Sequence, residues 1–482
     1  MRGLKKEARL PTVYEVIGVL ILFIVIMFGF INLLELPIQL ALFTSWFMVI
    51  GLGLWIGLRY KKLQDGLLQG ISNGLEAVLI LITVGALIGT WIAGGIVPSI
   101  IYYGLSVISP NIFLFATLII CALTSLATGT SFGTAGTAGI AMIGIGQSFG
   151  IPLPLVAGAV ISGAYVGDKL SPLSDTTVMT ASLTKVDIIE HIKSMLYVSG
   201  PAFGIASLLF IFVGFFYVGN SVDLTRAEEA MGALQGQFNI SWYMLVPPLI
   251  VIALLAMKQP SIPTITFGAF LGVIWGFAFQ GIPFLDAIQT SYQGYSIDSG
   301  IEFMDTLLNS GGMVSMLEVI LLILLALGLG GLMEAAGILH VICQTLLKWA
   351  DNAGKTTLTT LIAAFFGNFF GGAAYVSVIT GSKITEENYD RLNIDKRVLS
   401  RNTEAGGTIT TPMVPWSDGG VFMAVTLGVS TMAYLPFLWF HFLVIIITLL
   451  YGFTGKFIWY TKGKEYTENY EDSTVNTTKF EA

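Results

Sequence analysis

Two stretches of the chain place charged and hydroxyl side chains inside otherwise apolar sequence. The first runs from Gly167 to Thr177, and its Pro172 removes a backbone donor and stops a helix. Its candidate ligands all carry a charge or a hydroxyl group: Asp168, Lys169, Ser171, Ser174, Asp175, Thr176 and Thr177. Hard cations such as Na⁺ take hydroxyl, carboxylate and carbonyl oxygens, by the same logic that governs Ca²⁺ sites. This stretch therefore predicts a cation site at an interrupted helix.

The second stretch runs from Arg401 to Trp416 and is the counterpart of the first. It offers amide, carboxylate and hydroxyl oxygens from Asn402, Glu404, Thr408, Thr410 and Thr411. Two segments rich in small residues, 111–149 and 356–381, are predicted to be hairpins that enter the membrane and return. They add Thr128, Thr130, Ser131 and Thr137 from the first hairpin, and Asn368 and Ser377 from the second. We expect these groups to converge on one pocket, with Asp175, Ser171 and Thr411 as Na⁺ ligands.

Ionisable side chains at membrane depth are costly, so each one is a functional candidate. We expect Asp168, Asp175 and Glu404 to bind H⁺ and Na⁺ in competition. Structural roles stay open beside this one. Asp168 and Lys169 would then pair at a helix end, and Asp175 would cap the half-helix that follows it. Asp418 is equally a cap or a ligand.

The composition places both stretches in a membrane. Of 482 residues, 55% are apolar and only 11% are charged, against about 25% charged in soluble proteins. Mean hydropathy is +0.81. The formal charge of −7 leaves no basic face for phosphates. These values exclude a soluble enzyme, a disordered chain and a nucleic-acid binder, and they predict an all-α polytopic membrane protein.

The placement of lysine and arginine orients the chain, because these residues concentrate on the cytoplasmic side. It predicts ten crossings and two re-entrant hairpins, with both termini in the cytoplasm. The predicted parts are a cytoplasmic tail (1–12), a first repeat (13–219), an extracellular linker (220–239), a second repeat (240–460) and an acidic cytoplasmic tail (461–482). The first repeat starts inside and the second outside, which is the arrangement of an inverted repeat.

The sequence supports this repeat independently. LEAVLILITVGALIGTWIAGGI, from Leu75, falls without a gap on LEVILLILLALGLGGLMEAAGI, from Leu317, when the chain is shifted by 242 residues. The matched acids Glu76 and Glu318 lie near span ends, where we expect them to face water or to pair locally. Two interrupted helices at corresponding positions of inverted halves indicate a substrate site near the midplane.

Other functional classes fit the sequence less well. Gly129-Thr-Ser-Phe-Gly133 matches the G-x-S-x-G elbow of hydrolases, but that elbow needs a preceding strand and a histidine partner. An intramembrane aspartyl protease should show Tyr-Asp and Gly-x-Gly-Asp in its spans, whereas this chain has Tyr165-Val-Gly-Asp168. A passive channel would not need two interrupted helices in an inverted repeat. The pattern favours a carrier over an enzyme or a channel.

Two segments resemble the NhaC family of Na⁺/H⁺ antiporters. They are GAYVGDKLSPLSDTTVMTASLTKVDIIEHIKSMLY, from Gly163 to Tyr197, and SRNTEAGGTITTPMVPWSDGGVF, from Ser400 to Phe422. The resemblance implies a secondary antiporter of the bacterial plasma membrane. It also implies a scaffold domain, often dimeric, and a transport domain with two hairpins.

The resemblance leaves the substrate open. We favour Na⁺/H⁺ exchange, and the alternative is an exchanger that couples Na⁺ and H⁺ to an organic anion such as malate or lactate, or to an amino acid. A carboxylate substrate would need half-helix N-termini or a cation, for which Lys169 and Arg401 are candidates. The expected partners are the lipid bilayer, Na⁺, H⁺, a small carboxylate and a second copy of the chain. No cofactor is expected beyond the transported ions.

Overall fold

The computed structural model describes residues 8–218, 224–297, 305, 308–309 and 311–461. Within these residues the chain is almost entirely helical, with an isolated antiparallel bridge between Ile394 and Tyr460. More than half of the predicted tail 1–12, part of the linker 220–239 and nearly all of the tail 461–482 lie outside the described residues. The predicted all-α fold is confirmed.

Eight helices of the described chain are long and apolar enough to cross a membrane. They are α1 (Val13–Phe28), α2 (Ile38–Trp55), α4 (Leu75–Ala93), α6 (Pro110–Thr128), α9 (Leu153–Leu170), α11 (Ile188–Val213), α14 (Ser261–Phe279) and α17 (Leu317–Ala335). Two bent pairs raise the number to ten if each is one crossing. These are α12 (Leu224–Gln237) with α13 (Val246–Ala256), bent by 97°, and α22 (Asp418–Thr426) with α23 (Thr431–Tyr434), bent by 89°. The upper number equals the ten crossings predicted, but the members differ. The structural set includes α6, predicted as part of a hairpin, and leaves out the predicted crossing 436–453, whose helix Trp439–Thr454 is shorter.

The other helices are mostly shorter or more polar. They are α3 (Tyr60–Asn73), α5 (Ile96–Val107), α7 (Ser131–Thr134), α8 (Ile140–Ser148), α10 (Asp175–Leu183), α15 (Phe284–Gln293), α18 (Ile338–Trp349), α19 (Ala353–Gly371), α20 (Ala374–Arg391), α21 (Lys396–Gly406) and α24 (Trp439–Thr454). A π turn, η2 (Ala135–Gly139), joins α7 to α8, and a 3-10 turn, η6 (Thr408–Met413), follows α21.

Corresponding helices of the two halves have equal lengths. Helices α4 and α17 each have 19 residues, α5 and α18 each have 12, and α6 and α19 each have 19. The offset is 242 residues between α4 and α17, as the sequence match predicts, and it becomes 243 between α6 and α19. The order of elements therefore repeats from α4 to α10 and from α17 to α22.

Each hairpin turns at a glycine with left-handed backbone. Gly129 ends α6 with φ of 72°, and Gly372 ends α19 with φ of 68°. A side chain at either position would be strained, because only glycine adopts this region without steric cost. After the glycine and one extended residue the chain re-enters a helix, α7 in the first half and α20 in the second. The tips therefore present loosely paired backbone inside the molecule.

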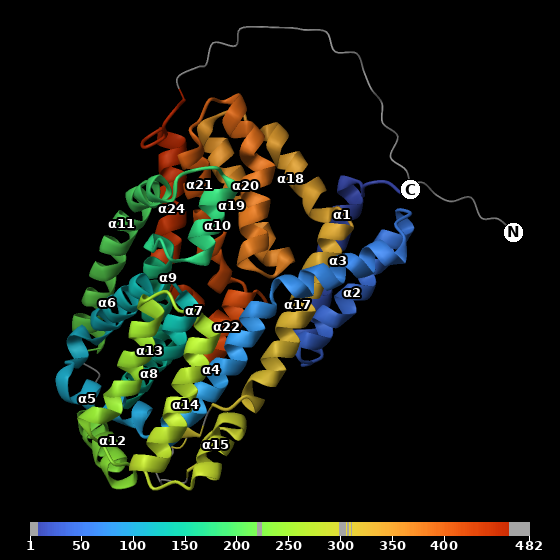
Figure 1. Ribbon diagram of the computed structural model, residues 1–482. Coiled ribbons are helices and arrows are strands. Elements are labelled where there is room, and N and C mark those ends of the chain that lie inside the picture. The colour runs from blue at the N-terminus through green and yellow to red at the C-terminus, as the bar shows by residue number, and fades with distance from the viewer. Residues whose placement is uncertain (1–7, 219–223, 298–304, 306–307, 310, 462–482) are drawn as a thin grey trace, which may run out of the picture.

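The two breaks lie where the sequence predicts them. Helix α9 ends at Leu170, just before Pro172, and α10 begins at Asp175 behind the N-cap Ser174. In the second half, η6 and the turn after it separate α21 from α22. In Figure 1, α10, α20 and α21 lie toward one end of the molecule, while α7 and α22 lie near its middle. The tips and the breaks thus meet near the middle of the molecule (Figure 1).

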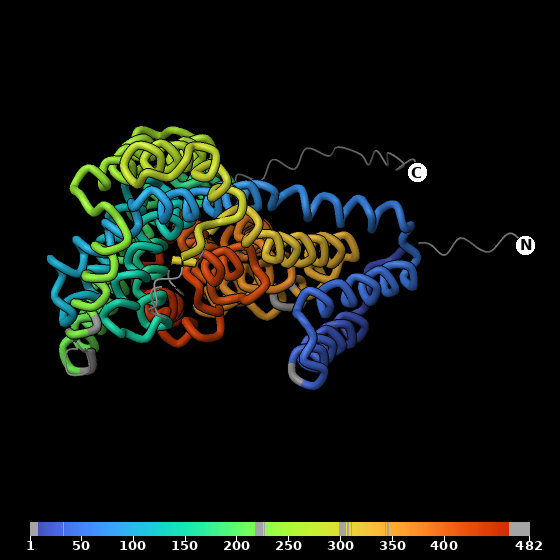
Figure 2. The backbone as a smooth tube through the Cα atoms, turned by 90° about the horizontal axis from the view of Figure 1, so that it is seen from below, coloured from blue at the N-terminus to red at the C-terminus, as the bar shows by residue number. Residues whose placement is uncertain are grey.

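Helices outside the hairpins form a wall beside this region. Helix α3 packs along α17, with Gly66 and Gly70 against Gly331. The sequence predicts residues 59–74 only as a connection between two spans, because their pattern is amphipathic rather than apolar throughout. Figure 2 shows α1, α2 and α3 projecting from the rest of the chain. Helix α4 continues directly from α3 and brings this wall to the hairpin tips.

Candidate functional site

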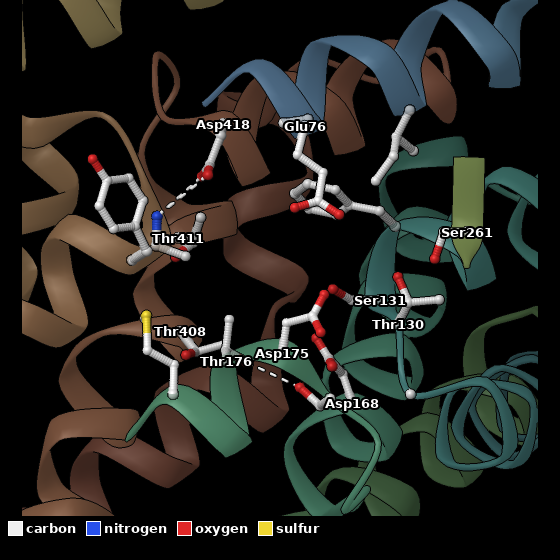
Figure 3. A pocket seen from close by; sticks show the side chains of 18 of the residues that line it. Glu76, Thr130, Ser131, Asp168, Asp175, Thr176, Ser261, Thr408, Thr411 and Asp418 are labelled. Atoms are coloured by element: carbon white, nitrogen blue, oxygen red, sulfur yellow. Dashed lines mark hydrogen bonds between the residues drawn. The ribbon is translucent and has the colours of Figure 1, made fainter. Parts of the chain in front are cut away.

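A cavity of about 310 Å³ lies where the tips and the breaks meet. Its lining comes from four sources: the first hairpin tip (Gly129, Thr130, Ser131, Phe132), the first broken helix (Tyr165, Asp168, Ser174, Asp175, Thr176, Met179), the second tip and break (Ala374, Tyr375, Thr408, Thr411, Asp418), and the wall (Asn73, Gly74, Glu76, Ala77, Ile80, Ser261). Figure 3 shows many of these side chains turned toward one space. Segments more than 300 residues apart in the chain therefore build a single site.

Asp168 connects the first break to the first hairpin tip. It is 6% exposed, near the end of α9. Its carboxylate faces the hydroxyl groups of Ser131 and Ser174 and the backbone amide of Ser131. Tyr165, one helical turn earlier, also faces Ser131 and is buried. Asp168 therefore holds the first hairpin tip in place and also lines the cavity.

Asp418 makes the equivalent link in the second half. Its two carboxylate oxygens each accept from the Ala374 amide at 3.3 Å, and one accepts from Gly419 at 2.7 Å. The Asp418 amide donates to Gly372 at 2.8 Å. Asp418 thus fastens the second tip to α22.

The two half-helices that follow the breaks begin alike. Ser174 caps α10 by accepting from Thr177, and Ser417 caps α22 by accepting from Gly420. The next residue is an aspartate in both halves, at the offset of 243. Asp418 is engaged by the tip, whereas the Asp175 side chain is exposed, lines the cavity and makes no hydrogen bond within the described chain. Asp175 is therefore the aspartate whose carboxylate the protein leaves unengaged.

The structure brings eight of the predicted site residues to the cavity. They are Asp168, Ser174, Asp175, Thr176, Thr411, Thr130, Ser131 and Thr408. Of the three predicted Na⁺ ligands, Asp175 and Thr411 line the cavity, and Ser171 does not. The Ser174 and Thr176 hydroxyl groups lie 3.1 Å apart.

Four other predicted residues hold the backbone instead of facing the cavity. Ser171 donates to the Leu126 carbonyl at 3.0 Å, and Thr177 donates to the carbonyls that end α9. Thr137 donates to Gly133 within its own helix at 2.7 Å. Ser377 donates to Ala364 across the second hairpin at 2.6 Å. Unpaired carbonyls near a break need such donors at membrane depth.

Asn368 organises the second break from the neighbouring helix α19. Its amide nitrogen donates to Gly407 at 2.7 Å and to the Thr410 hydroxyl at 2.8 Å. Its amide oxygen accepts from the Thr411 hydroxyl at 3.1 Å. This side chain therefore positions Thr411 at the cavity edge, although Asn368 and Thr410 do not line the cavity.

Asn402 has a similar structural role further from the cavity. It donates to the Thr357 hydroxyl at 3.1 Å and to the Tyr389 hydroxyl at 2.9 Å. These contacts join α21 to α19 and α20. Asn402 is fully buried and does not line the cavity.

Lys169 and Glu404 are buried behind the cavity. Lys169 is 1% exposed, and its Nζ has no hydrogen-bond partner in the described chain. Glu404 accepts from Thr180 at 2.7 Å through one carboxylate oxygen, while the other has no partner. The predicted ion pair between Asp168 and Lys169 is not among the salt bridges of the described residues. Arg401 points away, donating to the Phe457 carbonyl at 3.1 Å, so it cannot hold a substrate in the cavity.

The structure adds site residues that the sequence did not indicate as ligands. Glu76 and Ser261 come from the wall, and Tyr375 comes from the second tip. Asp418 was a candidate whose role, cap or ligand, stayed open. The repeat offset could have revealed Asp418, because it aligns Ser174-Asp175 with Ser417-Asp418. Nothing local marks Glu76, whose position depends on how α4 packs against α22.

The electrostatics of the cavity favour cations. Four carboxylates line it, and no lysine or arginine is among its described lining residues. Three half-helices, α10, α20 and α22, begin at residues that line it, so their positive ends also face this space. Carboxylates can bind Na⁺ or H⁺, and the helix ends can bind an anion that enters with such cations.

The crossings, the paired breaks and this cavity define a secondary transporter. Residues 9–193 and 163–456 match the Na⁺/H⁺ antiporter family, and the chain belongs to that family. This confirms the NhaC resemblance.

Three relatives match most of the chain. It is 58% identical over 457 residues to the malate-2H⁺/Na⁺-lactate antiporter of Bacillus subtilis, covering 95% of this chain and 98% of that protein. It is 37% identical over 405 residues to the Na⁺/H⁺ antiporter NhaC of Alkalihalophilus pseudofirmus, covering 84% and 87%. It is 35% identical over 420 residues to the arginine/ornithine antiporter ArcD of Halobacterium salinarum, covering 86% of each.

Proposed function

We propose that this antiporter exchanges H⁺ for Na⁺ while carrying a small hydroxycarboxylate in each direction, malate with protons and lactate with Na⁺. The identity of 58% to the malate-2H⁺/Na⁺-lactate antiporter supports this substrate pair. Transport without covalent chemistry is proposed, because Ser131 of the G-x-S-x-G motif lies at a hairpin tip that faces Asp168. No histidine is among the described lining residues.

The cavity itself carries the proposal. Its volume of about 310 Å³ falls at the lower end of the roughly 300–1,000 Å³ found for small-molecule sites. A dehydrated Na⁺ ion held by oxygen ligands fills only a small part of such a space. The remaining space suits an organic acid of a few carbon atoms.

The charges of the lining explain why such an acid would travel with cations. An anion that enters among four carboxylates is repelled unless H⁺ or Na⁺ neutralises the site. Asp175 offers an unengaged carboxylate, with the Thr176 and Ser174 hydroxyl groups next to it. Na⁺ bound there would bridge the lactate carboxylate to the protein. In the opposite direction of the exchange, H⁺ would take the place of Na⁺ when malate is bound.

The membrane setting follows from the same helices. The chain is a multi-pass membrane protein, and we propose that both termini face the cytoplasm, as the lysine and arginine placement predicts. The bacterial plasma membrane and the homodimer stay predictions from the family resemblance.

The test uses purified full-length protein in liposomes that contain a pH-sensitive dye and lactate. Malate is added outside together with an outward Na⁺ gradient. We expect malate uptake and internal acidification that require internal lactate and Na⁺ together. Proton movement driven by Na⁺ alone, with no uptake of labelled malate, would contradict the proposal.

Exchange of Na⁺ for H⁺ without an organic solute is the second candidate. It is favoured by the absence of lysine and arginine from the described lining, since a carboxylate site often contains one. The identity of 37% to the Na⁺/H⁺ antiporter NhaC of Alkalihalophilus pseudofirmus also supports it. The same liposomes decide between the two, because only this candidate moves protons without malate and lactate.

A further inference from the structure

Glu76 stands on the wall of the cavity opposite the broken helices. It lies in the first turn of α4 and lines the cavity, whereas Asp168 and Asp175 belong to the first broken helix. In Figure 3 its carboxylate extends from α4 toward the space that those aspartates approach from the other side. The Glu76 side chain is exposed to this space and makes no hydrogen bond in the described chain.

A glutamate in the first turn of a helix often only complements the helix dipole. Its repeat counterpart, Glu318, sits in the same first turn of α17 and accepts from Gln39 at 3.5 Å. Glu318 does not line the cavity. The two glutamates therefore share the helix-end position and differ in what they face, so the dipole alone does not account for the placement of Glu76.

The two loads of the proposed exchange differ by one carboxylate. Lactate with Na⁺ is neutral, and so is malate with two protons. One proton of the malate load can occupy the cation position near Asp175. The second proton must compensate the additional carboxylate. A dicarboxylate held by one end near Asp175 would direct its other end toward the opposite wall of the cavity.

We propose that Glu76 carries this second proton and shares it with the distal carboxylate of a dicarboxylate substrate. This inference rests on the proposed function. Two carboxyl groups that face each other in a confined site hold one proton between them, because both cannot be ionised there. Glu76 would then select the dicarboxylate in its protonated state.

The charged and titratable groups around Glu76 agree with this role. Asp418 on α22, Asp175 on α10 and Asp168 on α9 line the same cavity, as do Tyr375 from α20 and Tyr165 from α9. Helix α14 contributes Ser261 and α3 contributes Asn73, which are neutral. No described cation of the lining competes with a proton for the Glu76 carboxylate.

The experiment measures malate affinity against pH in liposomes for the wild type, E76Q, E76D and the matched control E318Q. On the alkaline side, two coupled protons change the apparent affinity by about 100-fold per pH unit, and one proton by about 10-fold. We expect the steeper dependence in the wild type, E76D and E318Q, and the shallower one in E76Q.

Each other outcome overturns the inference. An E76Q variant that keeps the 100-fold dependence shows that the second proton binds elsewhere. Loss of transport in both E76Q and E76D, with normal elution on size-exclusion chromatography, shows a structural role. A wild type that does not take up malate refutes the proposed function itself, and the inference falls with it.

Discussion

Replacing Asp175 by asparagine separates a cation ligand from a helix cap. The Asp175 carboxylate makes no hydrogen bond in the described chain, so Asp175→Asn should leave the fold intact. A carboxylate at a helix N-terminus contributes about 0.3–1 kcal/mol through the helix dipole. A carboxylate about 4 Å from a cation contributes about 4 kcal/mol at an effective dielectric constant near 20. Loss of a contribution the size of the helix-dipole effect would change the Na⁺ affinity by at most about fivefold. Loss of a direct carboxylate ligand would change it by about 1,000-fold.

The assay is the Na⁺ concentration that gives half-maximal proton movement in liposomes. We expect Asp175→Asn to raise it beyond the measurable range while the melting temperature in detergent stays within a few degrees of wild type. Asp65→Asn is the control, since Asp65 is an exposed partner of Lys61 at 3.1 Å, outside the cavity. If Asp175→Asn raises the half-maximal Na⁺ concentration by less than fivefold, Asp175 is not a Na⁺ ligand. Its role is then that of a helix cap alone.

Three substitutions test how the site is held together. Asp418→Ala should lower thermal stability by about 1–3 kcal/mol, because the partly buried Ala374 amide loses its acceptor, and an unchanged melting temperature would contradict the link. Gly167→Ala should reduce thermal stability by about 1–3 kcal/mol, because the added Cβ would overlap the backbone of α6. The control Gly204→Ala has open space around its Cβ and should leave the melting temperature unchanged. Asn368→Ala should reduce transport by a larger factor than it reduces the yield of folded protein, because it removes three hydrogen bonds from the second break. Near-normal Na⁺-driven transport would exclude that positioning role.

The interrupted helices could be predicted because their causes are local. Pro172 and Pro412 cannot donate a backbone hydrogen bond, and the polar residues around them are conspicuous in apolar sequence. The hairpins were predictable for a similar reason, since the turns at Gly129 and Gly372 need glycine. Helix α3 was not predicted as an element, because its apolar face is completed only by packing on α17.

The direction of each side chain at the breaks could not be predicted. Outside regular helix there is no fixed period, so neighbouring residues take unrelated directions. Ser171 thus turns to a carbonyl of α6 while Ser174 reaches the cavity. The role of Glu76 could not be predicted for a different reason. Its helix, α4, precedes the first break by about 100 residues, and only tertiary packing brings the two together.

The unequal engagement of Asp175 and Asp418 has a consequence for direction. In an inverted repeat, the states open to the two sides of the membrane differ mainly in which half adopts which conformation. One aspartate is fastened to its hairpin tip and the other is not, and we expect this imbalance to differ between the states open to the two sides of the membrane. When the protein turns to the other side, we expect Asp418 to be released and Asp175 to be fastened in its place.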